Sequence, residues 1–244
     1  MRRPKSSFSI YFSEGFQDGI PIALGYISVS FAFGLAAIRN GLPSWVPLFI
    51  SMTNFTSAGQ FAGMDLLLAG AGLLEIVAAI LVINIRYMLM SFSLTQKISK
   101  RMRFWQRFVL SFGITDEIFA LASQRIQPLK PAYLGGLILS PYLGWVLGTL
   151  LGATAGFMLP PAWRSALGVA LYAMFIAIII PPAKKYSPVF VVVIIAAALS
   201  CVLRYVPVLS TISGGWRIII CALAASGAGA LFCPVSEARL RLRR

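Results

Sequence analysis

Long apolar runs recur through most of this sequence, and each is about as long as a bilayer is thick. The run at 20–38, IPIALGYISVSFAFGLAAI, is followed by others separated by Pro, Gly, Lys or Arg. A helix that crosses the ~30 Å hydrocarbon core of a bilayer needs about 20 such residues. Only 11% of the 244 residues are charged, too few to cover the surface of a soluble domain. The pattern predicts an all-α, polytopic helical membrane protein.

Eight regions have the length and apolarity of a membrane span or of part of one. They are 20–38, 44–69, 70–92, 108–123, 132–158, 163–182, 187–203 and 212–233. Polar residues and glycine interrupt 44–69 and 108–123, which makes these two candidates for broken or re-entrant helices. Residues 1–19 hold no compact apolar core with a cleavage site, so 20–38 is expected to be a retained first span. We expect six to eight spans, with one or two broken or re-entrant regions.

The net charge is +14, and the basic residues that produce it lie mostly between the apolar runs and at the chain ends. Basic residues gather near both termini, in 97–107 and at 184–185. Cytoplasmic loops are enriched in Lys and Arg, so the charge indicates cytoplasmic termini at a cell (inner) membrane rather than nucleic-acid binding. If 97–107 is also cytoplasmic, 108–123 enters and leaves by one face, and 44–69 is re-entrant on the outer face. The alternative of eight full spans puts five basic residues of 97–107 outside, against the rule.

A short internal echo suggests two halves. Phe33-Gly34, Pro43 and Trp45 recur at the same spacing as Leu151-Gly152, Pro161 and Trp163. Many transporters are built from repeats with the substrate site at their interface. The single permease domain at 1–244 is therefore expected to contain half-repeats at 15–123 and 130–234, although four matched positions can also arise by chance.

The stretch 51–63, SMTNFTSAGQFAG, places polar side chains and two glycines in an apolar region. Gly59 and Gly63 each weaken a helix by about 1 kcal/mol relative to Ala. Irregular backbone at membrane depth is tolerated only where protein or a water-filled cavity satisfies it. The stretch predicts a break that lines the substrate path, with helix packing through small and polar residues as the alternative. The substrate-binding residues expected here are Asn54, Phe55, Ser57, Gln60 and Phe61.

Charged and polar residues also lie in the run 70–92. Glu75 and Arg86 are about 16 Å apart along a helix, so each needs a partner on another element. An ionisable residue within a span costs about 2.5–3.5 kcal/mol on insertion scales and usually marks a pathway. We assign Glu75 and Arg86 to coupling or gating and Asn84 to substrate binding. Snorkelling of Arg86 to the headgroups and an interfacial place for Glu75 are the alternatives.

Two adjacent carboxylates, Asp116 and Glu117, interrupt 108–123. A low-dielectric interior favours the neutral form of a carboxyl group, so one of the two is expected to exchange protons in coupling or gating. The alternatives are an ion pair with Arg86 and a cap for a helix that starts at Ile118. Thr115 and Phe119 are assigned to the substrate path.

The sequence offers little for catalysis or metal binding. It has no His, and the spacing of Cys201, Cys221 and Cys233 fits neither a metal site nor a disulfide framework. We expect no cofactor and no metal. An enzyme is not expected either, because Asp116 and Glu117 point apart as sequence neighbours instead of sharing a proton as an aspartyl pair does.

Four segments carry a resemblance to a known family: GIPIALGYISVSFAFG (19–34), NFTSAGQFAG (54–63), NIRYMLM (84–90) and FGITDEIFAL (112–121). In these segments the chain resembles the AzlC family, the large subunits of two-component branched-chain amino-acid exporters. The resemblance implies an inner-membrane permease that exports leucine, isoleucine and valine with a small hydrophobic AzlD-type partner.

The chain departs from the family pattern in two places. Ser28-Val29-Ser30 stand where relatives often read PFG, which leaves the identity of the substrate open. Tyr87 stands where many relatives have His, which removes a titratable group from any proton mechanism.

Residues and resemblance together predict a permease that exports branched-chain or similar neutral aliphatic amino acids, driven by a proton or by the membrane potential. The breaks at 54–60 and 115–117 are expected to meet and form its site. The alternatives are a channel or carrier for another small metabolite, and a structural subunit of a membrane complex.

Overall fold

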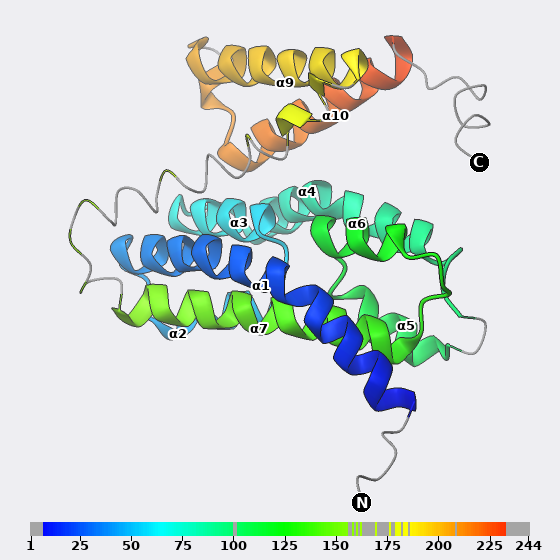
Figure 1. Cartoon of the computed structure of the whole chain (residues 1–244). Coiled ribbons are helices and arrows are strands. Elements are labelled where there is room, and N and C mark those ends of the chain that lie inside the picture. Colours follow the sequence, from blue (N-terminus) through cyan, green and yellow to red (C-terminus); the bar gives the residue numbers. More distant parts are fainter. Residues whose placement is uncertain are drawn as a thin grey trace, which may run out of the picture. The chain divides into compact units, whose positions relative to one another are not determined.

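The computed structural model describes residues 7–99, 102–155, 186–207 and 209–232, together with 158, 160, 162, 169, 176, 179–181, 183 and 184. Within these residues the chain is helical and contains no strand, so the predicted all-α class is confirmed (Figure 1). Its elements are α1 (Ser7–Arg39), α2 (Trp45–Thr53), α3 (Ala58–Leu68), α4 (Leu73–Leu94), α5 (Phe104–Ser111), α6 (Asp116–Gln124), α7 (Pro131–Ala155), α9 (Ser187–Tyr205), η2 (Leu209–Thr211) and α10 (Gly214–Phe232). Most of the predicted span 163–182 lies outside the described residues, as do the basic termini, Cys233, Pro161 and Trp163.

Five of the described helices, α1, α4, α7, α9 and α10, are long and apolar enough to cross a membrane. Most of the residues of α4 and α9 are not buried within the protein, as suits helices that face lipid. The start of the first span differs from the prediction, since α1 begins at Ser7 and not at 20. The added turns are stabilised by partners far along the chain: Glu14 binds Arg125 at 2.8 Å, and the Lys130 ammonium lies 3.6 Å from the centre of the Tyr11 ring.

The described residues belong to two compact units, one within Met1–Phe61 and Asn84–Leu171 and the other within Ala62–Ile83 and Tyr172–Arg244. The first unit contains α1, α2, α5, α6 and α7. The second contains α9 and α10. Helices α3 and α4 each contribute residues to both units.

Helices α1 and α7 form the core of the first unit, and they run parallel because the contacts advance together along both chains (Figure 1). Gly15 touches the backbone of Tyr133, whereas Gly148 touches the Ile27 carbonyl and Gly152 the Phe31 carbonyl. A Cβ atom at these glycines would collide with backbone of the other helix. Small residues permit such a close approach, which is how helices commonly associate in lipid, where no hydrophobic effect drives them together.

Both predicted helix breaks are present. The region 44–69 divides into α2 and α3 with a break at 54–57, and the region 108–123 divides into α5 and α6 with a break at 112–115. Helix α5 begins at Phe104, somewhat before the predicted boundary.

The segment that contains α5 and α6 begins and ends at the same end of the first unit. The Ser99 amide donates to the Leu129 carbonyl at 3.0 Å, and the Leu129 amide donates to the Lys97 carbonyl at 2.9 Å. Lys97 also donates to the Ser123 carbonyl. The chain therefore leaves α4, passes through the broken pair and returns to where it started.

In the second unit a small core forms from Leu66 on α3, Ala79 on α4 and Ile219 on α10. Glu75, in the first turn of α4, accepts hydrogen bonds from the Ser213 hydroxyl at 2.6 Å and from the Gly215 amide at 2.8 Å. The carboxylate thus satisfies a backbone amide in the first turn of α10, which would otherwise lack an acceptor.

Candidate functional site

The first break is an ordered turn between α2 and α3. The backbone amide of Asn54 ends α2 by donating to the Ile50 carbonyl at 2.8 Å. The Thr56 hydroxyl donates to the side-chain Oδ1 of Asn54 at 2.8 Å. Ser57 has a φ of 49°, a left-handed conformation that is uncommon for a residue other than glycine. Such a backbone persists only where the surroundings hold it.

Gly59 lets α4 approach this break. A Cβ at Gly59 would lie 2.9 Å from both polar atoms of the Asn84 amide and 2.6 Å from Thr56 Oγ1. Any larger side chain would therefore push Asn84 away from the first turn of α3. The predicted substrate-path residues of 54–60 and Asn84 are brought together in this way.

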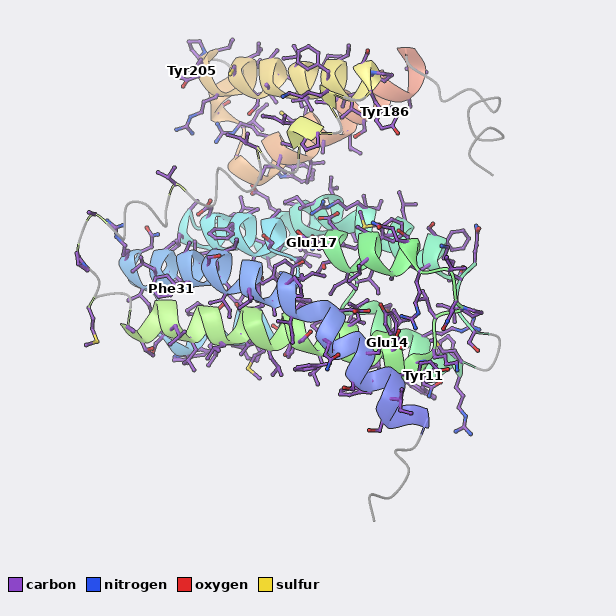
Figure 2. The ribbon with its side chains drawn as sticks, viewed as in Figure 1. Tyr11, Glu14, Phe31, Glu117, Tyr186 and Tyr205 are labelled. Atoms are coloured by element: carbon purple, nitrogen blue, oxygen red, sulfur yellow. The ribbon has the colours of Figure 1, made fainter. Side chains whose placement is uncertain are left out.

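The second break sets Thr115 at the start of α6, whose first turn holds Asp116 and Glu117. Thr115 occupies the N-cap position but makes no side-chain capping bond. Its hydroxyl oxygen instead lies 2.8 Å from the Tyr26 hydroxyl on α1, which also contacts Glu117. Glu117 is labelled in Figure 2. The helix begins two residues before Ile118, so the alternative of a cap for a helix starting there is not observed.

Charged side chains join the second break to α4. Arg86 Nη1 lies 2.6 Å from Asp116 Oδ2, and the two side chains are 39% and 23% exposed. The ion pair between Arg86 and an acid of the second break, given as an alternative from the sequence, is therefore present. Arg86 and Glu75 do have partners on different elements, as their spacing required.

Tyr87 extends this connection to the first break. Its hydroxyl accepts from Arg86 Nη2 at 2.9 Å and donates to the Thr56 carbonyl at 3.2 Å. The same carbonyl also accepts a hydrogen bond from the backbone amide of Gly59 at 3.4 Å, at the start of α3. Asp116, Arg86, Tyr87 and Thr56 thus form one polar chain that links the two breaks.

Aromatic side chains cover the same region. Phe55 is buried and packs edge-on against Tyr26, Tyr142 and Trp145, with ring centres 5.6 to 6.0 Å apart. Phe61 packs against Phe33. Phe119 is half-buried in the first turns of α6. Apolar surface therefore lies beside the polar chain.

Gln60 makes a second polar connection, from α3 to α7. Its Nε2 donates to the Ser51 hydroxyl at 3.0 Å, and Ser51 Oγ lies 2.7 Å from Thr149 Oγ1. All three residues are buried.

Three residues of this region were not predicted as site residues: Tyr26, Ser51 and Thr149. Each carries a hydroxyl group within an apolar run, which is the one sequence feature that could have marked it as a site residue. The partner of Tyr26 lies 89 and 91 residues away in sequence, which no local pattern reveals. Glu75 was assigned to gating with Arg86. Its described contacts are instead with the start of α10, which belongs to the second unit, as Glu75 itself does.

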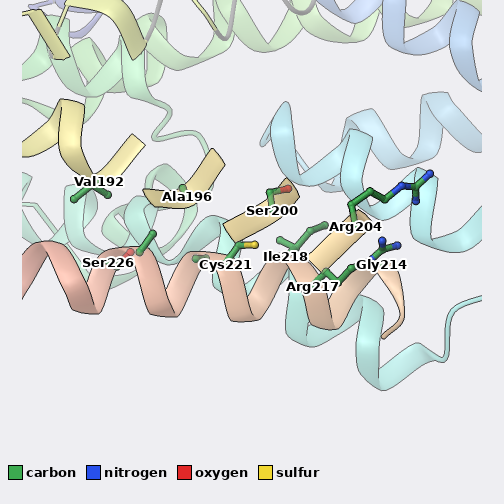
Figure 3. Close-up of a pocket in the computed structure, with 11 residues that line it drawn as sticks. Val192, Ala196, Ser200, Arg204, Gly214, Arg217, Ile218, Cys221 and Ser226 are labelled. Carbon is green, nitrogen blue, oxygen red and sulfur yellow. The ribbon is translucent and has the colours of Figure 1, made fainter. Parts of the chain in front are cut away.

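A separate cavity of about 560 Å³ lies between α9 and α10 in the second unit (Figure 3). Small and aliphatic side chains such as Val192 and Ala196 line most of it, with Arg204 and Arg217 at one end. None of its lining residues belongs to either helix break. Among the described residues, no three His, Cys, Asp or Glu side chains gather as a metal site.

The AzlC protein family matches residues 21–159, a stretch that includes both breaks. The inner membrane protein YgaZ of Escherichia coli (strain K12) is 31% identical over 199 residues, covering 79% of this chain and 81% of the relative. An uncharacterized membrane protein of Archaeoglobus fulgidus is 32% identical over 180 residues, 73% of this chain and 78% of the relative. The branched-chain amino acid transport protein AzlC of Bacillus subtilis is 24% identical over 148 residues, 59% of this chain and 58% of the relative. No solved structure matches the chain.

Proposed function

Because the chain belongs to the AzlC family, we propose that it is a permease that exports branched-chain or similar neutral aliphatic amino acids across the cell membrane. One relative carries the name branched-chain amino acid transport protein, which supports this substrate class. The proposed driving force is a proton or the membrane potential.

The observation that carries the proposal is the polar chain from Thr56 through Tyr87 and Arg86 to Asp116. It joins two interrupted helices inside an apolar protein. Interrupted helices at membrane depth expose backbone amides and carbonyls, and transporters use such half-helix ends to hold charged substrate groups.

In this proposal the breaks hold the ammonium and carboxylate groups of the zwitterion, while Phe55, Phe61 and Phe119 contact its aliphatic side chain. Asp116 or Glu117 acts as the proton-sensitive switch, and Arg86 supplies the counter-charge. The ion pair and the Tyr26–Glu117 contact support these roles because they connect both acids to other elements.

The test is counterflow of leucine, isoleucine and valine in vesicles that contain the purified protein, with and without a small hydrophobic AzlD-type subunit. Saturable counterflow supports a carrier, whereas non-saturating flux without counterflow supports a channel. Asp116→Asn and Glu117→Gln should each reduce leucine efflux or alter its pH dependence. If both variants leave efflux and its pH dependence intact, the assignment of the switch is wrong. A protein that keeps its membrane assembly but shows no flux would be a structural subunit.

We further propose cytoplasmic termini and re-entrant breaks. Helices α1 and α7 run parallel, so the chain between them crosses the membrane an odd number of times. Helix α4 supplies one crossing, and the α5–α6 segment returns to its starting end. The α2–α3 segment then returns to the outer face, and the long helices with the predicted span 163–182 make six crossings.

Cysteine labelling tests this topology. In a background with Cys201, Cys221 and Cys233 replaced by Ser, Arg103→Cys should react with an impermeant maleimide only from the cytoplasm. Asn40→Cys should react only from outside. Reaction of Arg103→Cys from outside would favour eight spans.

A further inference from the structure

We propose that the first break binds the ammonium group of the substrate through the side-chain oxygens of Ser57, Gln60 and Asn84. The inference rests on the transport function proposed above and specifies which substrate group this break recognises. Ser57 Oγ, Gln60 Oε1 and Asn84 Oδ1 are buried, and none has a hydrogen-bond partner among the described residues. Buried polar atoms are nearly always paired, so three unpaired oxygens in one region require a cause.

The side-chain amide of Gln60, only 1% exposed, is oriented with Nε2 donating to the Ser51 hydroxyl at 3.0 Å. The neighbouring hydroxyls are compatible with this orientation: Thr149 donates to the Trp145 carbonyl at 3.1 Å, and Ser51, 2.7 Å from Thr149, can donate to it. In this arrangement Gln60 Oε1 is left as an acceptor.

The three oxygens belong to neighbouring residues. Ser57 directly precedes α3, and the backbone amide of Gln60, in the first turn of α3, donates to the Ser57 carbonyl at 2.9 Å. Asn84 from α4 lies against Gly59, between them in sequence, because a Cβ there would be 2.9 Å from its amide atoms.

The chemistry of this cluster suits a cation. An ammonium group presents three donors and no acceptor, which matches three oxygen acceptors. The carboxyl end of α2 comes directly before the break, and helix carboxyl ends favour positive charge. The neighbouring cation, Arg86, is already paired with Asp116. Neutral oxygens hold an ammonium less tightly than a carboxylate would, and a transporter must release its substrate.

Two analogues of leucine separate the two ends of the zwitterion. In the leucine counterflow assay, 3-methylbutylamine (ammonium without carboxylate) should compete, and 4-methyl-2-oxopentanoate (carboxylate without ammonium) should not. Asn84→Leu removes one acceptor and should raise the amine concentration needed for half-maximal competition about tenfold. Asn84→Asp keeps an acceptor and should retain competition. Gln127→Leu, at an exposed loop position, is the control and should change nothing.

The outcomes are distinguishable from failure of the proposed function. Leucine counterflow in which the oxo acid competes and the amine does not would overturn the ammonium site. So would Asn84→Leu with unchanged amine competition. If replacing sodium by choline abolishes leucine counterflow and the amine does not compete, the oxygens bind a free monovalent cation instead. Absence of counterflow with every amino acid would refute the transport function itself.

Discussion

Arg86 on α4 and Asp116 in the first turn of α6 form an ion pair, with 2.6 Å between Nη1 and Oδ2. Arg86 also donates to the Tyr87 hydroxyl, which in turn donates to the Thr56 carbonyl in the first break. One guanidinium therefore influences the geometry of both interrupted helices.

Removing only one member of this pair should be more harmful than removing both. Arg86→Gln leaves Asp116 without its cation and should lower the free energy of unfolding by about 2 kcal/mol, less than for a fully buried pair because both side chains are partly exposed. The double variant Arg86→Gln/Asp116→Asn should recover most of that loss in thermal unfolding measured in detergent. An equally unstable double variant would contradict the ion pair as the cause.

Tyr26→Phe should alter the pH dependence of transport. The Tyr26 hydroxyl has one hydrogen and two oxygen neighbours, on Thr115 and Glu117. When Glu117 is ionised, Tyr26 donates to it. Tyr26→Phe removes this donor, so the pH profile of leucine counterflow should differ from that of the parent protein.

Tyr142→Phe is the matched control for Tyr26→Phe, since its hydroxyl bonds only the Met52 carbonyl at 3.0 Å among the described contacts. Its pH profile should equal that of the parent protein. Equal profiles for both variants would show that Tyr26 only packs against its neighbours.

Gly148→Ala should destabilise the protein by about 1–3 kcal/mol, because the new methyl group collides with the Ile27 backbone on α1. Thermal unfolding in detergent, followed by far-UV circular dichroism, measures the effect. Gly25→Ala on α1 is the control: no atom of another helix lies within 4 Å of its added Cβ. It should be neutral or stabilise by up to about 1 kcal/mol. A harmless Gly148→Ala would contradict the close parallel contact.

Glu75 should behave as a structural acceptor for α10. Glu75→Gln retains an oxygen for Ser213 and the Gly215 amide, so transport per folded molecule and its pH dependence should match the parent. Glu75→Ala should lower the unfolding temperature. A stable Glu75→Gln variant without transport would instead support the gating role predicted from the sequence.

The sequence was most informative where the departure from an apolar helix was local. Glycine and amide residues at 54–60 and the acidic pair at 116–117 predicted both breaks, because each weakens an uninterrupted helix inside lipid. These features act on their own segment, so neighbouring residues are sufficient to recognise them.

Contacts between distant segments were not predictable in the same way. The start of α1 at Ser7 depends on Arg125 and Lys130, more than 100 residues later, which neutralise Glu14 and cover Tyr11. Tyr26 looks like an ordinary residue of an apolar span until α6 brings Thr115 and Glu117 to it. The substrate roles of Asn54, Phe55, Phe61 and Phe119 remain predictions.

The glycine contacts between α1 and α7 also limit how the protein can move. Where two helices meet backbone to backbone, no side chain between them can change rotamer to absorb a displacement, and a small slide drives carbonyl oxygens into Cα atoms. We therefore expect α1 and α7 to move as one rigid pair. If the protein transports its substrate as proposed, the motion that exposes the substrate first to one side and then to the other is expected in the short half-helices α2, α3, α5 and α6.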